Sequence, residues 1–327
     1  MLYQNIELRY TSYNISFGKG YDYVGTGNIA PYNPESDKSD ILLMAGASSN
    51  HVVTALRCIL SFVYAFPFSP VLFVDFGITD QERCWLSYIF KVVKGFHDSK
   101  NVSAPIYFRT VNWSNLPDWM HITKAMNNGG YAWKPIVIAD AFYQWKGIVM
   151  WNDAGNLYRS WCNGAVDAVR KEGIYIPYDP AKLNRNFHDD SYSFLVHYHL
   201  SKPINRNTTS GRGGFMLFDY SNAVCRNEIM VRWVQCAFTR RCMTLKGVGR
   251  KQHLPEQGVL SVLIMNHNIS LSCSTRTNYF PHFWSDKNKN NTVIPNAPLE
   301  YDMTTFSEAS GQPYTQKQLV SDCLRFS

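Results

Sequence analysis

Two apolar segments separated by a helix-like stretch constrain the fold of this 327-residue chain most strongly. Ile41–Ala47 and Val71–Phe76 are apolar at nearly every position, which is typical of strands buried on both faces. Between them, apolar residues recur at helical spacing over Val52–Val63. A capping box at Thr79–Glu82 opens a second helix, and a third strand follows at Ala104–Val111. This order predicts an α/β fold with a mostly parallel central sheet flanked by helices.

The rest of the chain continues the alternation. A helix over Pro135–Trp145 precedes a fourth apolar strand at Gly147–Trp151. Further predicted strands are Gly173–Ile176, Phe194–Tyr198 and Phe215–Phe218, with a flexible turn at Gly211–Gly214. Two helices complete the prediction: one capped by Asn222 and extending to Thr239, and one over Pro255–Met265.

These elements predict a single Rossmann-like domain over residues 41–284, because no internal repeat and no sharp change of composition divides that stretch. Residues 1–40 are rich in Tyr, Asn, Gly and Pro and form an extended lead-in. The polar residues 285–327 form a tail that wraps around the domain.

No segment has the pattern of a membrane span or of a signal peptide. The longest apolar run, Cys58–Val74, is interrupted by Pro67 and Pro70, whereas a spanning helix needs about 20 apolar residues. Met1–Tyr10 has no apolar core of the kind found in signal peptides. We therefore expect no membrane span in this chain, and any anchor in a segment outside it.

The charge balance of the chain argues against a nucleic-acid partner. Only 17% of residues are charged and 45% are hydrophobic, so the chain can bury a core and is not disordered as a whole. Lys and Arg exceed Asp and Glu by 32 − 25 = 7, but the excess is spread along the chain and no block of like charge stands out. A nucleic-acid binder needs a basic stripe with interleaved aromatic residues, so we expect no nucleic-acid partner.

Cysteines and glycosylation sequons bear on the compartment. None of the eight cysteines forms a C-x-x-C pair, which argues against a zinc ribbon or a thioredoxin motif. Structural disulfides and buried free thiols both remain open, and Cys225, Cys236 and Cys242 lie close in sequence. Six Asn-x-Ser/Thr sequons favour the Golgi lumen if an anchor lies outside this chain. Without such an anchor we expect a soluble cytoplasmic protein.

Ligand-contact residues are expected at the carboxyl ends of the strands, where open α/β sheets bind their ligands. The first strand ends at Ala47, Ser48 and Asn50, and the second ends at Asp75. Asp153 follows the fourth strand and has two interpretations. It is either a carboxylate ligand of a divalent cation that bridges phosphates or a turn residue that bonds its own backbone.

Other candidates have a structural interpretation beside the functional one. Glu256 is either a general base or an acid favoured by the helix dipole at a helix start. His267 and His282 are each either a single metal ligand or a structural histidine. Gly213 either lets a backbone approach a ligand or simply forms a turn. Trp151 stacks on a sugar ring or packs in the core.

Several segments together resemble nucleotide-diphospho-sugar transferases of the GT-A type. The most similar family is a poorly characterised group of glycosyltransferases from invertebrates and some other eukaryotes. The segments that carry the resemblance are Ala45–His51, Leu72–Gly77, Trp133–Pro135, Val149–Gly155, Gly214–Phe218 and Glu256–Gln257. The resemblance covers residues 41–267, and it is the order and spacing of the segments that make it specific.

The resemblance implies a nucleotide-sugar donor, usually a UDP-sugar, bound along the first strand ends. It places Ala47, Ser48 and Asp75 near the base and ribose. Asp153 matches the first acid of a D-x-D motif that meets ribose or Mn²⁺ or Mg²⁺, but Gly155 stands where the motif has its second acid. Metal dependence therefore stays open.

The resemblance also suggests roles on the catalytic side. Glu256 stands where the family pattern has Asp and serves as the general base if the enzyme inverts. Lys134 or a metal ion meets the phosphates of the leaving diphosphate. Gly213, Gly214 and Trp151 line the acceptor side.

The resulting hypothesis is a glycosyltransferase, a hexosyl- or pentosyltransferase, that moves a sugar from a UDP-sugar to a hydroxyl of a glycan or glycoconjugate. The alternative is a catalytically silent protein on the same fold that binds nucleotide-sugar or carbohydrate. The absence of a second acid at Gly155 favours the alternative.

Overall fold

The computed structural model describes residues 29–80, 82–83, 86–87, 90, 93–94, 98, 104–122, 126–156, 163–248, 253–269 and 271. The chain divides into two compact units. Among the described residues, 33–111 and 151–156 belong to the N-terminal unit, and 29–32, 112–150 and 163–271 belong to the C-terminal unit. Most of the predicted lead-in and the whole predicted tail lie outside the described residues, and the single-domain prediction stays a prediction.

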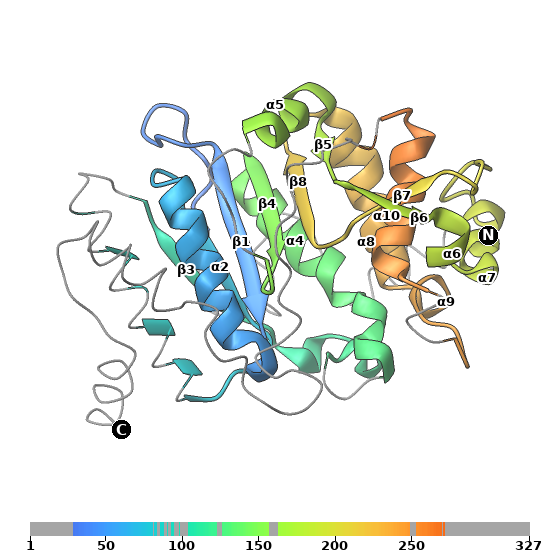
Figure 1. Cartoon of the computed structure of the whole chain (residues 1–327), viewed down its shortest axis with the longest axis horizontal. Coiled ribbons are helices and arrows are strands. Elements are labelled where there is room, and N and C mark those ends of the chain that lie inside the picture. The colour runs from blue at the N-terminus through green and yellow to red at the C-terminus, as the bar shows by residue number, and fades with distance from the viewer. Residues whose placement is uncertain are drawn as a thin grey trace. The chain divides into compact units, whose positions relative to one another are not determined.

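The N-terminal unit contains three parallel strands, β1 (Ile41–Ala47), β2 (Val71–Asp75) and β3 (Ile106–Thr110). Leu43 of β1 pairs with Val71, and the register continues to Ala47 opposite Asp75. Every residue of β1 and β2 is buried, as expected for strands covered on both faces. Helix α2 (Val52–Ala65) follows the short 3-10 turn η1 (Ser49–His51) and packs on β1 (Figure 1). The predicted β-α-β opening is confirmed.

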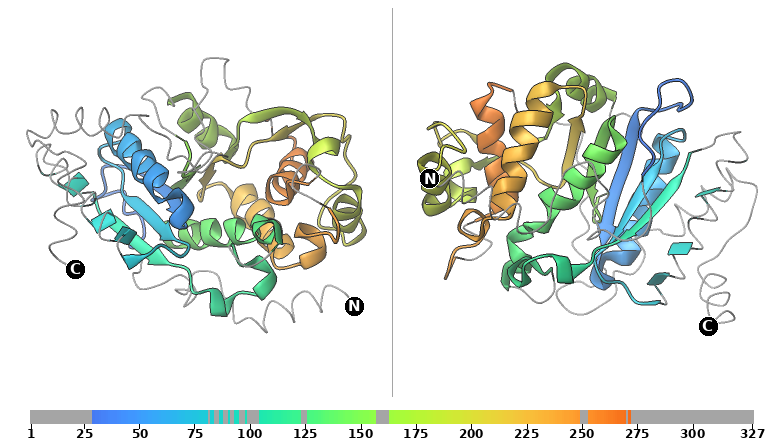
Figure 2. Two further views of the ribbon diagram at one scale, coloured as in Figure 1. Left: turned by 60° about the horizontal axis from the view of Figure 1, so that its bottom comes forward. Right: turned by 180° about the vertical axis from the view of Figure 1, so that it is seen from behind.

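The C-terminal unit is mainly helical. Its first part contains the 3-10 turns η2 (Trp113–Asn115), η3 (Asp118–Met120) and η4 (Met126–Tyr131), followed by α4 (Trp133–Trp145). The middle contains α5 (Asn163–Glu172), α6 (Leu183–Asn186) and α7 (Asp189–His197). The last part contains the π-helical turn η5 (Cys225–Ile229), α8 (Met230–Ala237), α9 (Arg240–Met243) and α10 (Pro255–Asn266) (Figure 2). Helix α8 packs against α4, α9 and α10.

The strands of the C-terminal unit are short. β5 (Ile174–Tyr175) pairs antiparallel with β8 (Phe215–Asp219), and β6 (Tyr178–Lys182) pairs antiparallel with β7 (Thr209–Gly211). With β4 (Ile148–Asp153), the described strands form a six-stranded sheet in the order β3-β2-β1-β4-β8-β5 and a separate two-stranded β6-β7 sheet. The predicted α/β class with a mostly parallel central sheet flanked by helices is confirmed.

Two predictions about local structure are wrong. Residues 194–198, predicted as a strand, lie in and just after helix α7, because Asp189 and Asp190 occupy its first turn and the His188 side chain accepts a hydrogen bond from the Asp190 amide. The predicted flexible turn at Gly211–Gly214 is partly strand, because Gly211 belongs to β7. The β6-β7 pair has no clear counterpart in the sequence pattern.

Helices α4 and α10 are buried on nearly all sides, and this determines where their polar residues lie. All residues of α10 from Pro255 to Ile264 are buried. Gly258 permits this, because a Cβ atom there would lie 2.5 Å from the ring of Phe187. Lys134 in the first turn of α4 and Glu256 in the first turn of α10 are therefore withdrawn from bulk water.

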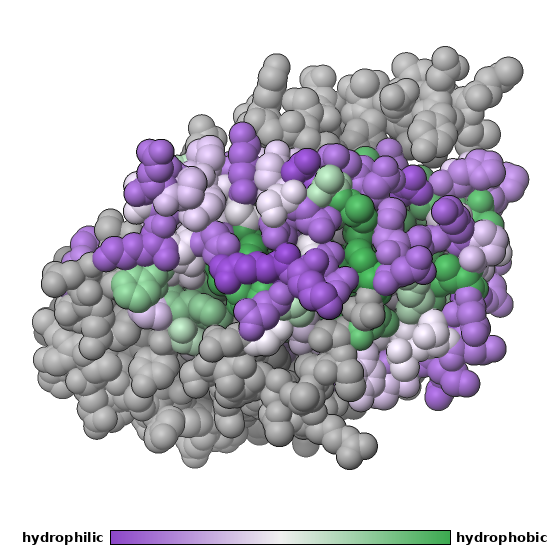
Figure 3. Space-filling model, turned by 90° about the horizontal axis from the view of Figure 1, so that it is seen from above, coloured by the Kyte–Doolittle hydropathy of each residue, from purple (hydrophilic) through white to green (hydrophobic). Residues whose placement is uncertain are grey.

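The described surface is largely polar. Figure 3 shows hydrophilic residues over most of the described surface in that view, with smaller apolar areas between them. Phe68 and Val224 are the exposed large hydrophobic residues of the described part of the chain. Within that part, no helix combines the length and the apolar character needed to cross a bilayer.

Candidate functional site

A buried ion pair is the chemically most distinctive feature of the C-terminal unit. The Nζ atom of Lys134 lies 3.8 Å from Oε1 of Glu256, and the two side chains are 3% and 6% exposed. The same Nζ donates a 3.2 Å hydrogen bond to the carbonyl oxygen of Gly213. Burying two charges is costly unless each is paired, so this contact holds the starts of α4 and α10 and the Gly213 turn together.

Gly213 lies against the first turn of α10. Its amide donates to Oε1 of Gln257 over 3.3 Å, and a Cβ atom at this position would lie 3.3 Å from the same Glu256 oxygen that faces Lys134. Such a contact is tighter than most side chains tolerate, so glycine keeps the backbone close to both polar residues. Gly214 directly precedes β8. The structure thus brings Lys134, Gly213 and Glu256 together.

Gln257 is a residue that the sequence prediction did not single out. Its Oε1 atom holds the Gly213 amide, while its buried Nε2 atom has no hydrogen-bond partner among the described residues. A buried amide donor of this kind normally has a partner, so it is a candidate contact for a bound ligand. In the sequence it is marked only by its position beside Glu256 at a helix start and by its place in the Glu256–Gln257 segment of the resemblance.

Two aromatic rings flank the buried cation. The Nζ atom of Lys134 lies 5.5 Å from the ring centre of Tyr131 and 5.9 Å from that of Trp133. Tyr131 has a positive φ of 55°, an uncommon backbone conformation for a bulky residue. The rings favour the ammonium through their π faces and exclude water on that side.

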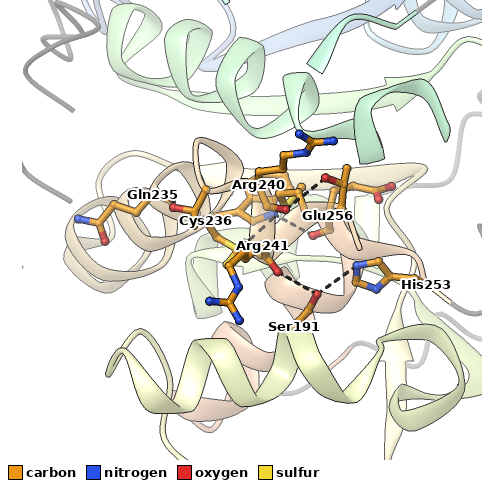
Figure 4. The surroundings of a disulfide bond; sticks show 12 residues. Ser191, Gln235, Cys236, Arg240, Arg241, His253 and Glu256 are labelled. Atoms are coloured by element: carbon orange, nitrogen blue, oxygen red, sulfur yellow. Dashed lines mark hydrogen bonds between the residues drawn. A yellow bond between two sulfur atoms is a disulfide. The ribbon is translucent and has the colours of Figure 1, made fainter. Parts of the chain in front are cut away.

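The start of α10 is fixed from a second direction. The indole N–H of Trp233 in α8 donates to the carbonyl oxygen of Glu256 over 2.8 Å. Nearby, a disulfide joins Cys236 of α8 to Cys242 of α9, and Figure 4 shows Glu256 among the residues around it. Both possibilities left open for the cysteines therefore occur. Cys236 and Cys242 form a disulfide, and Cys58 and Cys225 are buried free thiols.

His253 links three segments near the disulfide. Its Nε2 atom lies 3.3 Å from Oγ of Ser191, and the Ser191 hydroxyl donates to the carbonyl oxygen of Arg241 (Figure 4). Its Nδ1 atom accepts a hydrogen bond from the His188 amide. Burial, and secondarily the neighbouring His188, lower the pKa of His253 to about 4. The imidazole is therefore neutral at physiological pH.

In the N-terminal unit, the end of β1 carries three of the predicted donor-binding residues. Ala47 and Ser48 are buried and Asn50 is exposed. The Ser48 hydroxyl donates to Oδ1 of Asn50 over 2.7 Å. Their predicted contact with a nucleotide stays a prediction.

Asp75 at the end of β2 is fully buried and its carboxylate already has four partners. Oδ1 accepts hydrogen bonds from the Gly77 and Ile78 amides, and Oδ2 accepts one from Thr110 and pairs with Arg83 at 2.8 Å. These contacts hold the turn after β2 and tie it to β3. Any contact with a donor base or ribose would have to compete with them, and this role too stays a prediction.

Asp153 closes β4 and is partly exposed. Its Oδ1 atom accepts a 2.8 Å hydrogen bond from the indole N–H of Trp151, whose side chain is buried. The neighbouring Asn152 donates to the thiol of Cys58 in α2. Trp151 thus orients Asp153, and in this position it offers no exposed ring face for a sugar to stack on.

The predicted metal ligands do not gather into a complete set. Among the described residues, no group of three or more His, Cys, Asp or Glu side chains could hold a metal ion. His267 caps the end of α10, where burial is the main cause that lowers its pKa. His282 lies outside the described residues. Asp153 is a single carboxylate with one oxygen already engaged, so the described residues alone do not fit Mn²⁺ or Mg²⁺.

Replacing Lys134 with methionine should destabilise the protein by about 3 to 5 kcal/mol, because it removes the cation that lies 3.8 Å from the buried Glu256 carboxylate. The double variant Lys134→Met/Glu256→Leu should recover most of this loss, since it removes both charges. Urea unfolding of the three proteins measures the effect. A cost below about 1 kcal/mol for Lys134→Met would show that the pair is not a structural constraint.

The stability of the protein should fall as the pH is lowered from neutrality. The pKa of His253 is about 4 in the folded protein and near 6.5 when unfolded, so the unfolded state binds the proton first. The contribution of His253 is complete above pH about 6.5 and is lost progressively down to about 4. Urea unfolding at several pH values should show a shallower decline for His253→Gln. An equal decline in both proteins would exclude His253 as the source.

Comparisons with known proteins give structural likenesses only. No protein-family model matches the sequence, and no curated protein matches it either. Among solved structures, the mannosyltransferase Ktr4p from S. cerevisiae in complex with GDP matches with a TM-score of 0.46 and 10% identity, over 97% of this chain and 93% of that one.

Two further solved structures are also glycosyltransferases. The galactosyltransferase LgtC in complex with donor and acceptor sugar analogues matches with a TM-score of 0.43 and 12% identity, over 84% of this chain and 98% of that one. The bifunctional glycosyltransferase WbbM in its apo form matches with a TM-score of 0.44 and 12% identity, over 86% of this chain. This chain covers only 46% of WbbM. All three TM-scores lie below 0.5.

Proposed function

We propose that this protein is a glycosyltransferase that moves a sugar from a nucleotide-diphosphate donor, a UDP-sugar, to a hydroxyl of a glycan or glycoconjugate. The observation that carries the proposal is the buried Lys134–Glu256 pair beside the Gly213 turn. The cluster contains a carboxylate, a cation, an amide donor and a glycine backbone without a side chain. These are the groups that a transferase site needs if it accepts a proton from the acceptor hydroxyl. We also propose that the protein has the GT-A type of fold and belongs to the eukaryotic glycosyltransferase family that its sequence resembles.

Glu256 is the general base of the proposed reaction if the enzyme inverts. The acceptor hydroxyl gives its proton to the carboxylate while its oxygen bonds to the anomeric carbon. The bond from that carbon to the diphosphate oxygen breaks, and the diphosphate leaves with the electron pair. Lys134 acts as a positioning residue, because its ammonium group lies 3.8 Å from the Glu256 carboxylate and fixes its orientation.

This assignment changes the role first expected for Lys134. Its ammonium group is buried and faces Gly213 and Glu256, so a phosphate would have to enter this buried cluster to meet it. Gln257 is the better candidate for a ligand contact in this unit, because its Nε2 atom has no partner among the described residues. We still propose Gly213 and Gly214 as acceptor-side residues, because the Gly213 backbone contacts Lys134 and Gln257 directly and carries no side chain.

On the donor side we propose Ser48, Asn50 and Asp153 as contacts with the nucleoside diphosphate. Their strand-end positions and their polar groups support this. A divalent cation would neutralise the leaving diphosphate where present. The described residues do not by themselves form a site for such an ion, so the proposed steps involve only Glu256 and Lys134.

We further propose that the protein resides in the Golgi lumen. The Cys236–Cys242 disulfide supports an oxidising compartment, because disulfides are rare in the reducing cytosol. The Asn-x-Ser/Thr sequons agree with that location.

The function is tested by measuring release of UDP from a panel of UDP-sugars, with and without Mn²⁺, in the presence of mixed glycan acceptors. At least one donor should be turned over. Glu256→Gln should lower the rate by about 10²- to 10⁴-fold, the usual loss when a general base is removed. Asp153→Asn should weaken donor use, and Glu35→Gln, at an exposed site, should leave the rate unchanged.

Three outcomes separate the alternatives. Turnover that survives Glu256→Gln would remove this residue from the mechanism. Binding of UDP-sugars by calorimetry without turnover would favour the silent binding protein, an outcome that Gly155 at the second acid position makes worth testing. If no UDP-sugar is bound or turned over at millimolar concentration, that result contradicts the proposal as a whole.

A further inference from the structure

The positive excess of the chain is more concentrated than its composition suggests. Between Ile229 and Pro255 the sequence holds six basic residues and no Asp or Glu: Arg232, Arg240, Arg241, Lys246, Arg250 and Lys251. The whole chain has a net charge of +7, so this one stretch carries nearly all of it. The prediction that the excess is spread along the chain, with no block of like charge, is therefore wrong for this segment.

Three of these cations lie on α9 and the loop that follows it. Arg240, Arg241 and Lys246 are exposed, and none of them forms an ion pair with another residue of the described chain. We call these three residues the α9 cations. Exposed like charges that lack acidic partners repel one another, so they generate a positive potential over this part of the C-terminal unit.

The α9 cations are held on a rigid support. The disulfide from Cys236 to Cys242 encloses Arg240 and Arg241 in a short covalent loop. The Thr239 amide bonds to the carbonyl oxygen of Cys236, and the Ser191 hydroxyl bonds to that of Arg241. The two arginines therefore project from a backbone that is fixed at both ends.

The same support reaches the proposed base. Helix α9 packs against α10, whose first turn contains Glu256. Ser191 connects the Arg241 carbonyl to His253, three residues before Glu256, and Figure 4 shows these residues around the disulfide. A small pocket lies between the segments and is lined by Tyr131, Met243, Leu245, His253 and Pro255, among others. Helix α9, which carries Arg240 and Arg241, thus borders α10.

The direction of the arginines points to the kind of anion. Figure 4 shows the side chains of Arg240 and Arg241 pointing away from each other, so one phosphate or carboxylate would not meet both. An extended ligand with repeated negative charges would meet them separately. We propose that the α9 cations form a subsite for an anionic glycan that bears carboxylate or sulfate groups, as acceptor or acceptor extension. This inference rests on the proposed glycosyltransferase function.

A membrane surface is the other polyanion that a basic cluster can bind, and the structure favours the glycan. Interfacial helices combine cations with large apolar side chains that enter the lipid. The exposed large hydrophobic residues of the described chain, Phe68 and Val224, both lie outside the loop that carries the α9 cations. The loop therefore offers charge without an apolar anchor.

The test measures binding of a heparin-derived octasaccharide, which carries sulfate and carboxylate, and of a hyaluronan octasaccharide, which carries carboxylate alone. The full chain is compared with Arg240→Gln/Arg241→Gln/Lys246→Gln by calorimetry at about 0.15 M salt. The matched control is Lys182→Gln/Arg185→Gln/Lys202→Gln, which removes three exposed cations of the same unit. Thermal unfolding checks that both variants are folded.

The α9 variant should bind the heparin octasaccharide at least about tenfold more weakly and with a smaller dependence on salt, while the control should change by less than about twofold. Equal losses in both variants, or binding of phosphatidylserine vesicles in place of both octasaccharides, would overturn the inference. Because this assay needs no donor, glycan binding through α9 without UDP release would refute the proposed function alone. UDP release by a chain that binds neither octasaccharide would refute the α9 subsite alone.

Discussion

The buried contact between Lys134 and Glu256 is the constraint on which the candidate site depends. A charge placed in a helix that is covered on all sides is tolerated only with a partner, and each of these residues provides the partner of the other. Their pairing fixes the position of the first turn of α4 relative to the first turn of α10. The Gly213 carbonyl then accepts from the same ammonium, so the turn before β8 follows from the ion pair.

Further contacts make this arrangement rigid. Trp233 holds the Glu256 carbonyl, and the Gln257 amide group holds the Gly213 backbone. The disulfide and the Ser191–His253 contact support the same helix start from the side of α9. A catalytic carboxylate needs such support, because a loosely held base loses most of its effect. The cluster is thus built as functional sites are, with each polar group oriented by another.

The fold could be predicted well where burial dictates the sequence. β1 was expected over Ile41–Ala47 and has those bounds, since a strand covered on both faces must be apolar throughout. The capping box at Thr79 and Glu82 was also readable, and both of its hydrogen bonds are present. The pattern of Phe194–Tyr198 predicts a short strand where the structure has the end of helix α7, because periodicity cannot distinguish a strand from a helix over so few residues.

The site could be predicted only in part. Glu256 and Gly213 were named from position and resemblance, but their contact with Lys134 joins residues 79 and more positions apart, which no local pattern encodes. Gln257 belongs to the Glu256–Gln257 segment of the resemblance, but its role could not be predicted, because the burial of an amide group has no sequence signature. The engagement of Asp75 with Arg83 and Thr110 was equally hidden, since the sequence shows a strand-end acid but not its partners.

The central claim is that the Lys134–Glu256 cluster takes part in sugar transfer. Hydrogen–deuterium exchange of the intact chain, with and without a UDP-sugar whose binding has been measured by calorimetry, tests it most directly. The account predicts slower amide exchange at Gly213, Gly214 and the first turn of α10 when the donor is bound, and no such change with UDP alone. Unchanged exchange at these residues with the donor bound would contradict the claim.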